Sequence, residues 1–120
     1  MVVDDHPTFR KCLIRVLREI EELDISCAAD GWQAVVLATR FHPDVVIMDV
    51  NMPVMNGIEA TRTIAEALPG VRVIGLSMDS ELETANEMRA AGAIDHFVKD
   101  GPVEELLTLI QSQLDLIRQQ

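Results

Sequence analysis

Five polar side chains in this sequence have the types and positions needed to handle a phosphoryl group. They are three carboxylates, a hydroxyl and an ammonium group: Asp4, Asp5, Asp49, Ser77 and Lys99. Each stands at or just beyond the end of a short apolar segment. Taken singly, each residue is explained at least as well as a solvated loop residue or a helix cap. Their common placement favours one shared site.

Three carboxylates held close together repel one another, so either one of them is protonated or a cation neutralises them. Oxygen ligands in an incomplete shell suit Mg²⁺, which keeps several waters and often completes its coordination with phosphate oxygens. A carboxylate can attack phosphorus and form an acyl phosphate, while a metal and an ammonium group neutralise charge on the transferring oxygens. We therefore expect Mg²⁺ as the cofactor and a carboxylate as the phosphoryl acceptor.

Two kinds of segment alternate along the chain and must position these side chains. Short runs rich in β-branched residues predict buried strands over residues 2–4, 24–29, 44–49, 71–77 and 94–98. Helices are predicted between them. The first follows Pro7 with an apolar face of Phe9, Leu13, Val16, Leu17 and Ile20. The others are expected at about 31–41, 58–68 and 81–91, and after Gly101 and Pro102.

Strict alternation of strands and helices with short links predicts an α/β fold, a parallel sheet between two layers of helices. Ligands bind such sheets at the carboxyl ends of the strands, which is where the five polar side chains fall. A chain of 120 residues corresponds to a single domain, here 1–120. Only three residues precede the acidic pair, so we expect the natural protein to extend upstream and this domain to be excised from a longer chain.

The composition excludes several other classes of function. A formal charge of −10 disfavours direct nucleic-acid binding, and no apolar run approaches the length of a membrane span. The amino terminus is acidic and lacks the features of a secretory signal, so the expected compartment is the cytoplasm. Cys12 and Cys27 have no metal-ligand spacing and are expected to be reduced, partly buried thiols, with a disulfide as the less favoured alternative.

Four segments, in order and over essentially the whole chain, make the sequence resemble the receiver domains of bacterial two-component response regulators. They are VVDDHP at 2–7, MDVNMPVMNG at 48–57, GLS at 75–77 and FVK at 97–99. The resemblance implies a (βα)5 flavodoxin-like fold with strand order 2-1-3-4-5. It also implies Asp49 as phosphoacceptor, Lys99 as the group that clamps the phosphoryl oxygens, and Ser77 as the switch hydroxyl. The implied Mg²⁺ ligands are Asp5, Asp49 and the Asn51 backbone carbonyl, with Asp4 holding a metal-bound water.

The same resemblance implies the partners and the mode of action. The phosphoryl group would come from the phosphohistidine of a sensor histidine kinase or from a phosphotransfer protein. Phosphorylation would switch the surface made by the fourth helix, fifth strand and fifth helix, where an output domain, a partner protein or a second copy would bind. Such a domain is not an enzyme in the ordinary sense but promotes its own phosphorylation and dephosphorylation. Asn51 and Asp79 occupy positions that tune hydrolysis in the family.

The sequence allows two alternatives for the role of His96 and two for the architecture of the parent protein. The family typically has Tyr or Phe three residues before the lysine, as a ring that moves inward on switching, and here the residue is His96. It is either such a ring or a solvent-facing histidine at a strand end. The Asp-His-Pro opening resembles receivers attached to helix-turn-helix domains, whereas residues 88–93 also resemble receivers of hybrid sensor kinases.

Two functions of other classes compete with the receiver hypothesis. A phosphohydrolase of the haloacid dehalogenase type also uses an aspartate, Mg²⁺ and a lysine. It places its two acidic residues as Asp-x-Asp on the first strand, however, whereas Asp4 and Asp5 are adjacent. An interaction module that keeps the fold without being phosphorylated is disfavoured by the intact Asp49 and Lys99.

Overall fold

The computed structural model describes residues 1–20, 22–78 and 80–119 as five strands that alternate with five helices. The strands are β1 (Val2–Val3), β2 (Cys27–Ala28), β3 (Val45–Asp49), β4 (Arg72–Ser77) and β5 (Asp95–Val98). The helices are α1 (Pro7–Leu17), α2 (Gly31–Phe41), α3 (Gly57–Ala67), α4 (Leu82–Ala91) and α5 (Val103–Arg118). The predicted (βα)5 pattern is confirmed.

All five strands are parallel and form one sheet in the order β2-β1-β3-β4-β5. The chain passes from β1 to β2 on one side and then returns to place β3 on the other side of β1. The strand order therefore reverses between β1 and β3, and ligands of such sheets bind at this kind of reversal. Val3 is in register with Met48, so the residues that follow β1 lie beside the end of β3.

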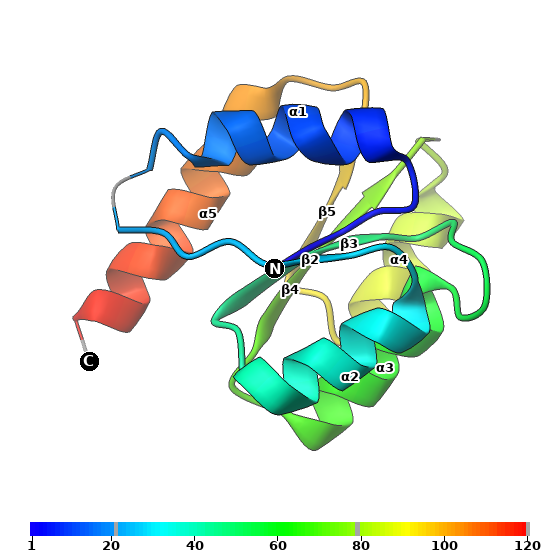
Figure 1. Cartoon of the computed structure of the whole chain (residues 1–120). Coiled ribbons are helices and arrows are strands. Elements are labelled where there is room, and N and C mark those ends of the chain that lie inside the picture. The colour runs from blue at the N-terminus through cyan, green and yellow to red at the C-terminus, as the bar shows by residue number, and fades with distance from the viewer. Residues whose placement is uncertain (21, 79, 120) are drawn as a thin grey trace.

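Side chains alternate between the two faces of the sheet, and each face has its own layer of helices (Figure 1). On β3 and β4 the core toward α2, α3 and α4 contains Val46, Met48 and Val73. The opposite core, toward α1 and α5, contains Ile47, Ile74 and Leu76. Because both faces are covered, the strands are apolar without polar alternation, as the sequence predicted.

The helices begin at recognisable signals. Pro7 occupies the first turn of α1, where its missing N–H costs nothing. Side-chain oxygens cap two helices: Asp30 accepts from the Gln33 N–H at the start of α2, and Asn56 accepts from the Glu59 N–H at the start of α3. Four of the five helices begin within one residue of the position predicted from such signals, and α5 begins directly after Pro102 as expected.

Some sequence-based predictions need correction. The second strand, expected over 24–29, forms ladder pairs only at Cys27–Ala28, because its neighbour β1 offers only Val2 and Val3 to pair with. The first helix ends at Leu17, so Ile20 lies in the following turn, although it still packs on the α1/α5 core.

The two cysteines were predicted to be partly buried, and this is wrong. Cys12 and Cys27 are free thiols, as expected, but both are exposed to solvent. Cys12 precedes the buried Leu13 on α1 and lines a solvent-open groove between α1 and the start of α5, with Phe97 and Val103. Cys27 belongs to β2, which is the edge strand of the sheet formed by the described residues.

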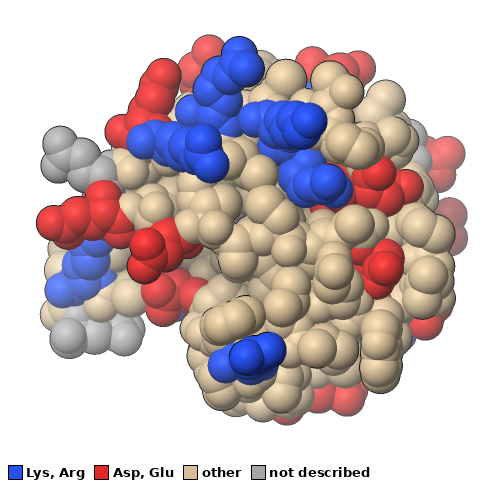
Figure 2. Space-filling model, in the orientation of Figure 1, with Lys and Arg blue, Asp and Glu red and all other residues tan. Residues whose placement is uncertain are grey.

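The surface charge is unevenly distributed although the chain is acidic overall. Figure 2 shows lysine and arginine side chains gathered over the region of α1. That helix and the residue after it carry Arg10, Lys11, Arg15 and Arg18, four of the ten cationic residues of the chain, and no Asp or Glu. Among the described residues, no helix is long and apolar enough to cross a lipid bilayer.

Candidate functional site

The three predicted carboxylates meet where β1 and β3 end. Asp4 and Asp5 directly follow β1, and Asp49 is the last residue of β3. The Asp4 N–H donates to the Ala28 carbonyl at 3.1 Å, which fixes the backbone at the start of the acidic pair. Asp4 and Asp49 are each only 1% exposed, whereas the side chain of Asp5 is 28% exposed and faces the opening of the site.

Lys99 reaches this cluster from the residue that follows β5. Its Nζ lies 2.6 Å from Asp4 Oδ2 and 3.2 Å from Asp49 Oδ2, and its side chain is 4% exposed. Its backbone N–H donates to the Ser77 carbonyl at 2.8 Å, and its ammonium group lies over the Phe9 ring of α1. One buried cation is therefore shared between two buried carboxylates, and the aromatic ring adds a favourable cation–π contact.

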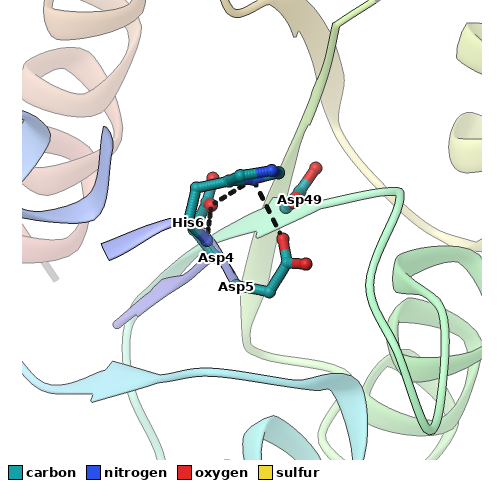
Figure 3. Close-up of side chains that lie close together, drawn as sticks. All are labelled: Asp4, Asp5, His6 and Asp49. Carbon is teal, nitrogen blue, oxygen red and sulfur yellow. Dashed lines mark hydrogen bonds and ion pairs between the residues drawn. The ribbon is translucent and has the colours of Figure 1, made fainter. Parts of the chain in front are cut away.

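The carboxylate oxygens of this cluster could also hold a divalent cation. Asp4 Oδ2, Asp5 Oδ1 and Asp49 Oδ2 are buried, and within the described part of the chain none accepts a hydrogen bond. The first and last of these form ion pairs with Lys99, and Asp5 Oδ1 lies 3.1 Å from His6 Nδ1. Ligand atoms of Asp4, Asp5, His6 and Asp49 all lie within 4.8 Å of one another (Figure 3). Buried carboxylate oxygens in excess of the available donors fit a hard ion such as Mg²⁺.

The electrostatics of the site act most strongly on Asp49. The pKa of this carboxyl is raised from 3.8 to about 6: burial and, to a smaller extent, the Asp4 carboxylate raise it, and the nearby Lys99 ammonium group lowers it. The ionised form of Asp49 is therefore costly in the metal-free protein, and added positive charge would stabilise it.

The loop between β3 and α3 shapes the side of the site nearest Asp49. The Asn51 N–H lies 3.3 Å from Asp49 Oδ1, and the Gly57 N–H donates to the Val50 carbonyl. A Cβ atom at Gly57 would lie 2.1 Å from the Asp49 carbonyl oxygen, so only glycine allows the helix start to approach β3 so closely. Asp79, in the loop after β4, lies outside the described residues.

Ser77 ends β4 and is fully buried, and its hydroxyl bonds to a side chain of the neighbouring strand. Ser77 Oγ and His96 Nε2 are 2.8 Å apart. The His96 ring is half-buried and points inward, so the solvent-facing alternative does not describe it. A Cβ at Gly75 would lie 2.4 Å from His96 Nδ1 and 2.8 Å from Met88 Cε, so glycine makes the space for the ring. A switching role for His96 stays a prediction.

Thus Asp4, Asp5, Asp49 and Lys99 lie together as expected, and Asn51 and Ser77 flank them. Sequence reasoning assigned no role to two further residues. His6 belongs to the carboxylate cluster, and its place directly after the acidic pair was the available signal. The space that Gly75 leaves for His96 had no signal beyond the glycine itself.

The comparisons with known proteins agree with this geometry. A family model described as the response regulator receiver domain matches residues 1–111. Response regulator GacA of Pseudomonas aeruginosa is 36% identical over 112 residues, which are 92% of this chain and 52% of that protein. The transcriptional regulatory protein DegU of Brevibacillus brevis is 32% identical over 112 residues, 92% of this chain and 48% of that protein. The chain thus spans about half the length of these curated relatives.

Solved structures show the same likeness. A two-component response regulator of the LuxR family from Aurantimonas sp. SI85-9A1 superposes with a TM-score of 0.89 at 32% identity, over 96% of this chain and 83% of that one. A chain of the CheX–CheY–BeF3–Mg²⁺ complex of Borrelia burgdorferi gives a TM-score of 0.85 at 29% identity, over 92% of this chain and 84% of that one. The order of the sheet, the convergence of Asp4, Asp5, Asp49 and Lys99 at its reversal, and these matches lead to one conclusion: the chain belongs to the response regulator receiver domain family.

Proposed function

We propose that Asp49 accepts a phosphoryl group from the phosphohistidine of a sensor histidine kinase or of a phosphotransfer protein, in a Mg²⁺-dependent reaction. The observation that carries this proposal is the position of Asp49. Its carboxylate is 1% exposed, lies 3.2 Å from the Lys99 ammonium group, and sits beside two further carboxylates at the strand-order reversal. A buried carboxylate with an excess of neighbouring negative charge needs a cation, and a cation beside it would favour transfer of an anionic group.

The transfer requires one bond to form and one to break. A carboxylate oxygen of Asp49 attacks phosphorus, a P–O bond forms, and the P–N bond to the donor imidazole breaks with its electron pair remaining on nitrogen. Lys99 neutralises charge on the phosphoryl oxygens during the transfer, because its ammonium group already lies at the Asp49 carboxylate. Hydrolysis later breaks the acyl P–O bond as a water oxygen bonds to phosphorus. The chain hydrolyses the phosphoryl group that it carries itself. It is therefore a phosphoacceptor rather than an enzyme that acts on a separate substrate.

Asp5, Asp49 and the backbone carbonyl of Asn51 would hold the Mg²⁺ ion, with Asp4 binding a water of its shell. When bound, the ion neutralises the carboxylate cluster and the charge on the phosphoryl oxygens. The similar complex from Borrelia burgdorferi, which contains both BeF3 and Mg²⁺, supports this assignment by analogy.

Treatment with acetyl phosphate and Mg²⁺, followed by intact-protein mass spectrometry, tests the acceptor assignment. We expect one added phosphoryl group on the parent and none on Asp49→Asn, because the amide has nearly the same shape but is a much poorer nucleophile. Asp5→Ala should lose labelling together with Mg²⁺ binding. Steady release of phosphate without a labelled protein would indicate a phosphohydrolase, and no labelling at all would indicate an interaction module.

We further propose that phosphorylation acts through Ser77 and His96 on the surface formed by α4, β5 and α5. A phosphoryl group on Asp49 would offer acceptor oxygens to the Ser77 hydroxyl, which is engaged with His96 Nε2 at 2.8 Å. Loss of that bond would release the ring from its place beside Gly75 and Met88 of α4. One or two charge-assisted hydrogen bonds of about 1.5–3 kcal/mol each would change the population of the two states by about one to a few powers of ten.

Amide chemical shifts recorded with beryllofluoride and Mg²⁺, a stable substitute for the phosphoryl group, test this route. The parent should shift along α4 and the first half of α5, and Ser77→Ala should shift only around Asp49. His96→Phe is the matched variant, because it keeps a ring in the space beside Gly75 without the hydrogen bond. A Ser77→Ala protein that transmits the change as fully as the parent would rule out the hydroxyl as the coupling group.

The partner of the switched surface is proposed to be an output domain, another protein or a second copy of the chain. The excess of negative charge supports a protein partner over direct contact of this domain with nucleic acid or an anionic membrane.

Free, exposed thiols at Cys12 and Cys27 fit the reducing cytoplasm, which is the proposed compartment. The coverage of about half of each curated relative supports the view that 1–120 is one domain of a longer protein.

A further inference from the structure

His6 places a nitrogen atom within the carboxylate cluster. Its Nδ1 lies 3.1 Å from Asp5 Oδ1 and 3.4 Å from Asp4 Oδ1, and Figure 3 draws both contacts across the opening between the side chains. Ligands bound at about 2.1 Å in an octahedral shell are separated by about 3.0 Å when adjacent, and those in a tetrahedral shell by about 3.4 Å. The separation between this nitrogen and Asp5 Oδ1 therefore matches the spacing of adjacent ligands around one metal ion.

The local backbone explains why the imidazole faces the cluster. His6 is the N-cap residue of α1, with φ −95° and ψ 105°, and its side chain makes no capping hydrogen bond. Its backbone N–H donates to Asp4 Oδ1 at 2.7 Å, which holds the residue against the acidic pair. Pro7 then fixes the first helical residue. The side chain is 61% exposed, so an ion arriving from solvent meets the imidazole at the rim of the site.

We infer that His6 is a ligand of the metal site and makes it favour ions that bind imidazole well, such as Zn²⁺, over Mg²⁺. This inference rests on the proposed function, in which the carboxylates of Asp5 and Asp49 hold a divalent cation. Imidazole nitrogen binds Zn²⁺ and related ions well, whereas Mg²⁺ prefers oxygen ligands and keeps its waters. A nitrogen ligand therefore adds affinity for the first group of ions and little for Mg²⁺.

The coordination test uses Mn²⁺ as the probe, with pulsed electron paramagnetic resonance to detect coupling of the ion to ¹⁴N. The parent should show coupling to one imidazole nitrogen, and His6→Ala should lose it. His42→Asn is the matched control, since it removes another exposed histidine whose left-handed backbone (φ 49°) asparagine tolerates. That control should keep the coupling.

The selectivity test measures Mg²⁺ and Zn²⁺ affinity by calorimetry in a Cys12→Ser, Cys27→Ser background, so that exposed thiols do not bind Zn²⁺. His6→Ala should weaken Zn²⁺ binding by about tenfold or more and Mg²⁺ binding by less than about threefold. His6→Asn, which supplies a good N-cap, separates any loss of helix stability from loss of the ligand.

The outcomes separate this inference from the proposed function on which it rests. An unchanged nitrogen coupling in His6→Ala, or equal losses of Zn²⁺ and Mg²⁺ affinity, would overturn the ligand role of His6. If Mg²⁺ binding is then still lost in Asp5→Ala, the proposed metal site stands without it. If the parent binds no divalent ion, both fail together.

Discussion

Replacing Asp49 by asparagine should stabilise the protein at neutral pH, although it removes the proposed phosphoacceptor. Burial raises the pKa of Asp49 from 3.8 to about 6, so the folded protein holds this proton more tightly than the unfolded chain does. The stability that the protonated carboxyl provides is fully present below about pH 4 and is lost as the pH rises through about 6. At 1.36 kcal/mol per pKa unit, the ionised carboxyl costs about 3 kcal/mol of folding free energy at pH 7.5.

Asparagine removes the buried negative charge, but it also removes the favourable ion pair with Lys99. Its amide group would face the Lys99 ammonium group, which lies 3.2 Å from the present Oδ2, and the ion pair would be lost. We therefore expect a net gain of about 1–3 kcal/mol in the free energy of unfolding at pH 7.5, falling toward zero near pH 4. Urea unfolding at four pH values between 4 and 7.5, without Mg²⁺, measures this difference directly.

Two comparisons make the result decisive. Asp115→Asn removes an exposed carboxylate of α5 and should show no such pH-dependent gain. Mg²⁺ at ten times its dissociation constant should stabilise the parent by about 1.4 kcal/mol and so narrow its gap to Asp49→Asn. An Asp49→Asn protein no more stable than the parent at pH 7.5, or equally more stable at pH 4, would refute the reasoning that burial of an ionised Asp49 limits stability.

Three further predictions follow from the backbone and the surface. Val54→Gly should raise the free energy of unfolding, measured in urea, by about 1 kcal/mol. Val54 is 82% exposed and has φ 69°, a backbone region that is unfavourable to β-branched residues. Val54→Ala should raise the free energy of unfolding by less. Gly57→Ala should lose more than about 3 kcal/mol in the same assay, because its Cβ would lie 2.1 Å from the carbonyl oxygen that ends β3. Gly70→Ala, with open space around it, is the control and should be nearly neutral. Cys12 and Cys27 should react with Ellman's reagent in the native protein at rates near those in urea, and protection of either would contradict their exposure.

The site was predictable because its geometry follows from topology. In a parallel sheet all strands end at one edge, so polar residues placed after apolar segments must meet there. Asp4, Asp49 and Lys99 come from three different strand ends, and their sequence positions were sufficient to bring them together. The two-sided burial of β3 and β4 likewise followed from their unbroken apolar character.

What escaped prediction depends on neighbours that the local sequence does not encode. The length of β2 is limited by the two residues that β1 offers, and the apolar character of 24–29 carries no information about that partner. The exposure of Cys12 depends on how closely the start of α5 packs against α1, because Cys12 lines the groove left between them. The inward position of the His96 ring, one of two alternatives that the sequence left open, depends on a missing Cβ on the adjacent strand, at Gly75.

The cluster of cationic side chains on α1 gives this acidic molecule one locally positive face. Residues 7–18 carry a formal charge of +4, so the rest of the chain carries −14 within the total of −10. Within about one Debye length, about 8 Å at physiological salt, the positive charge of α1 exerts a torque on an approaching protein. This torque turns the acidic side of that protein toward α1 before the two make contact. The dependence of the association rate on ionic strength thus reports which face an acidic partner approaches. Added salt should slow the association of an acidic partner that docks on α1 and accelerate that of an acidic partner that docks elsewhere.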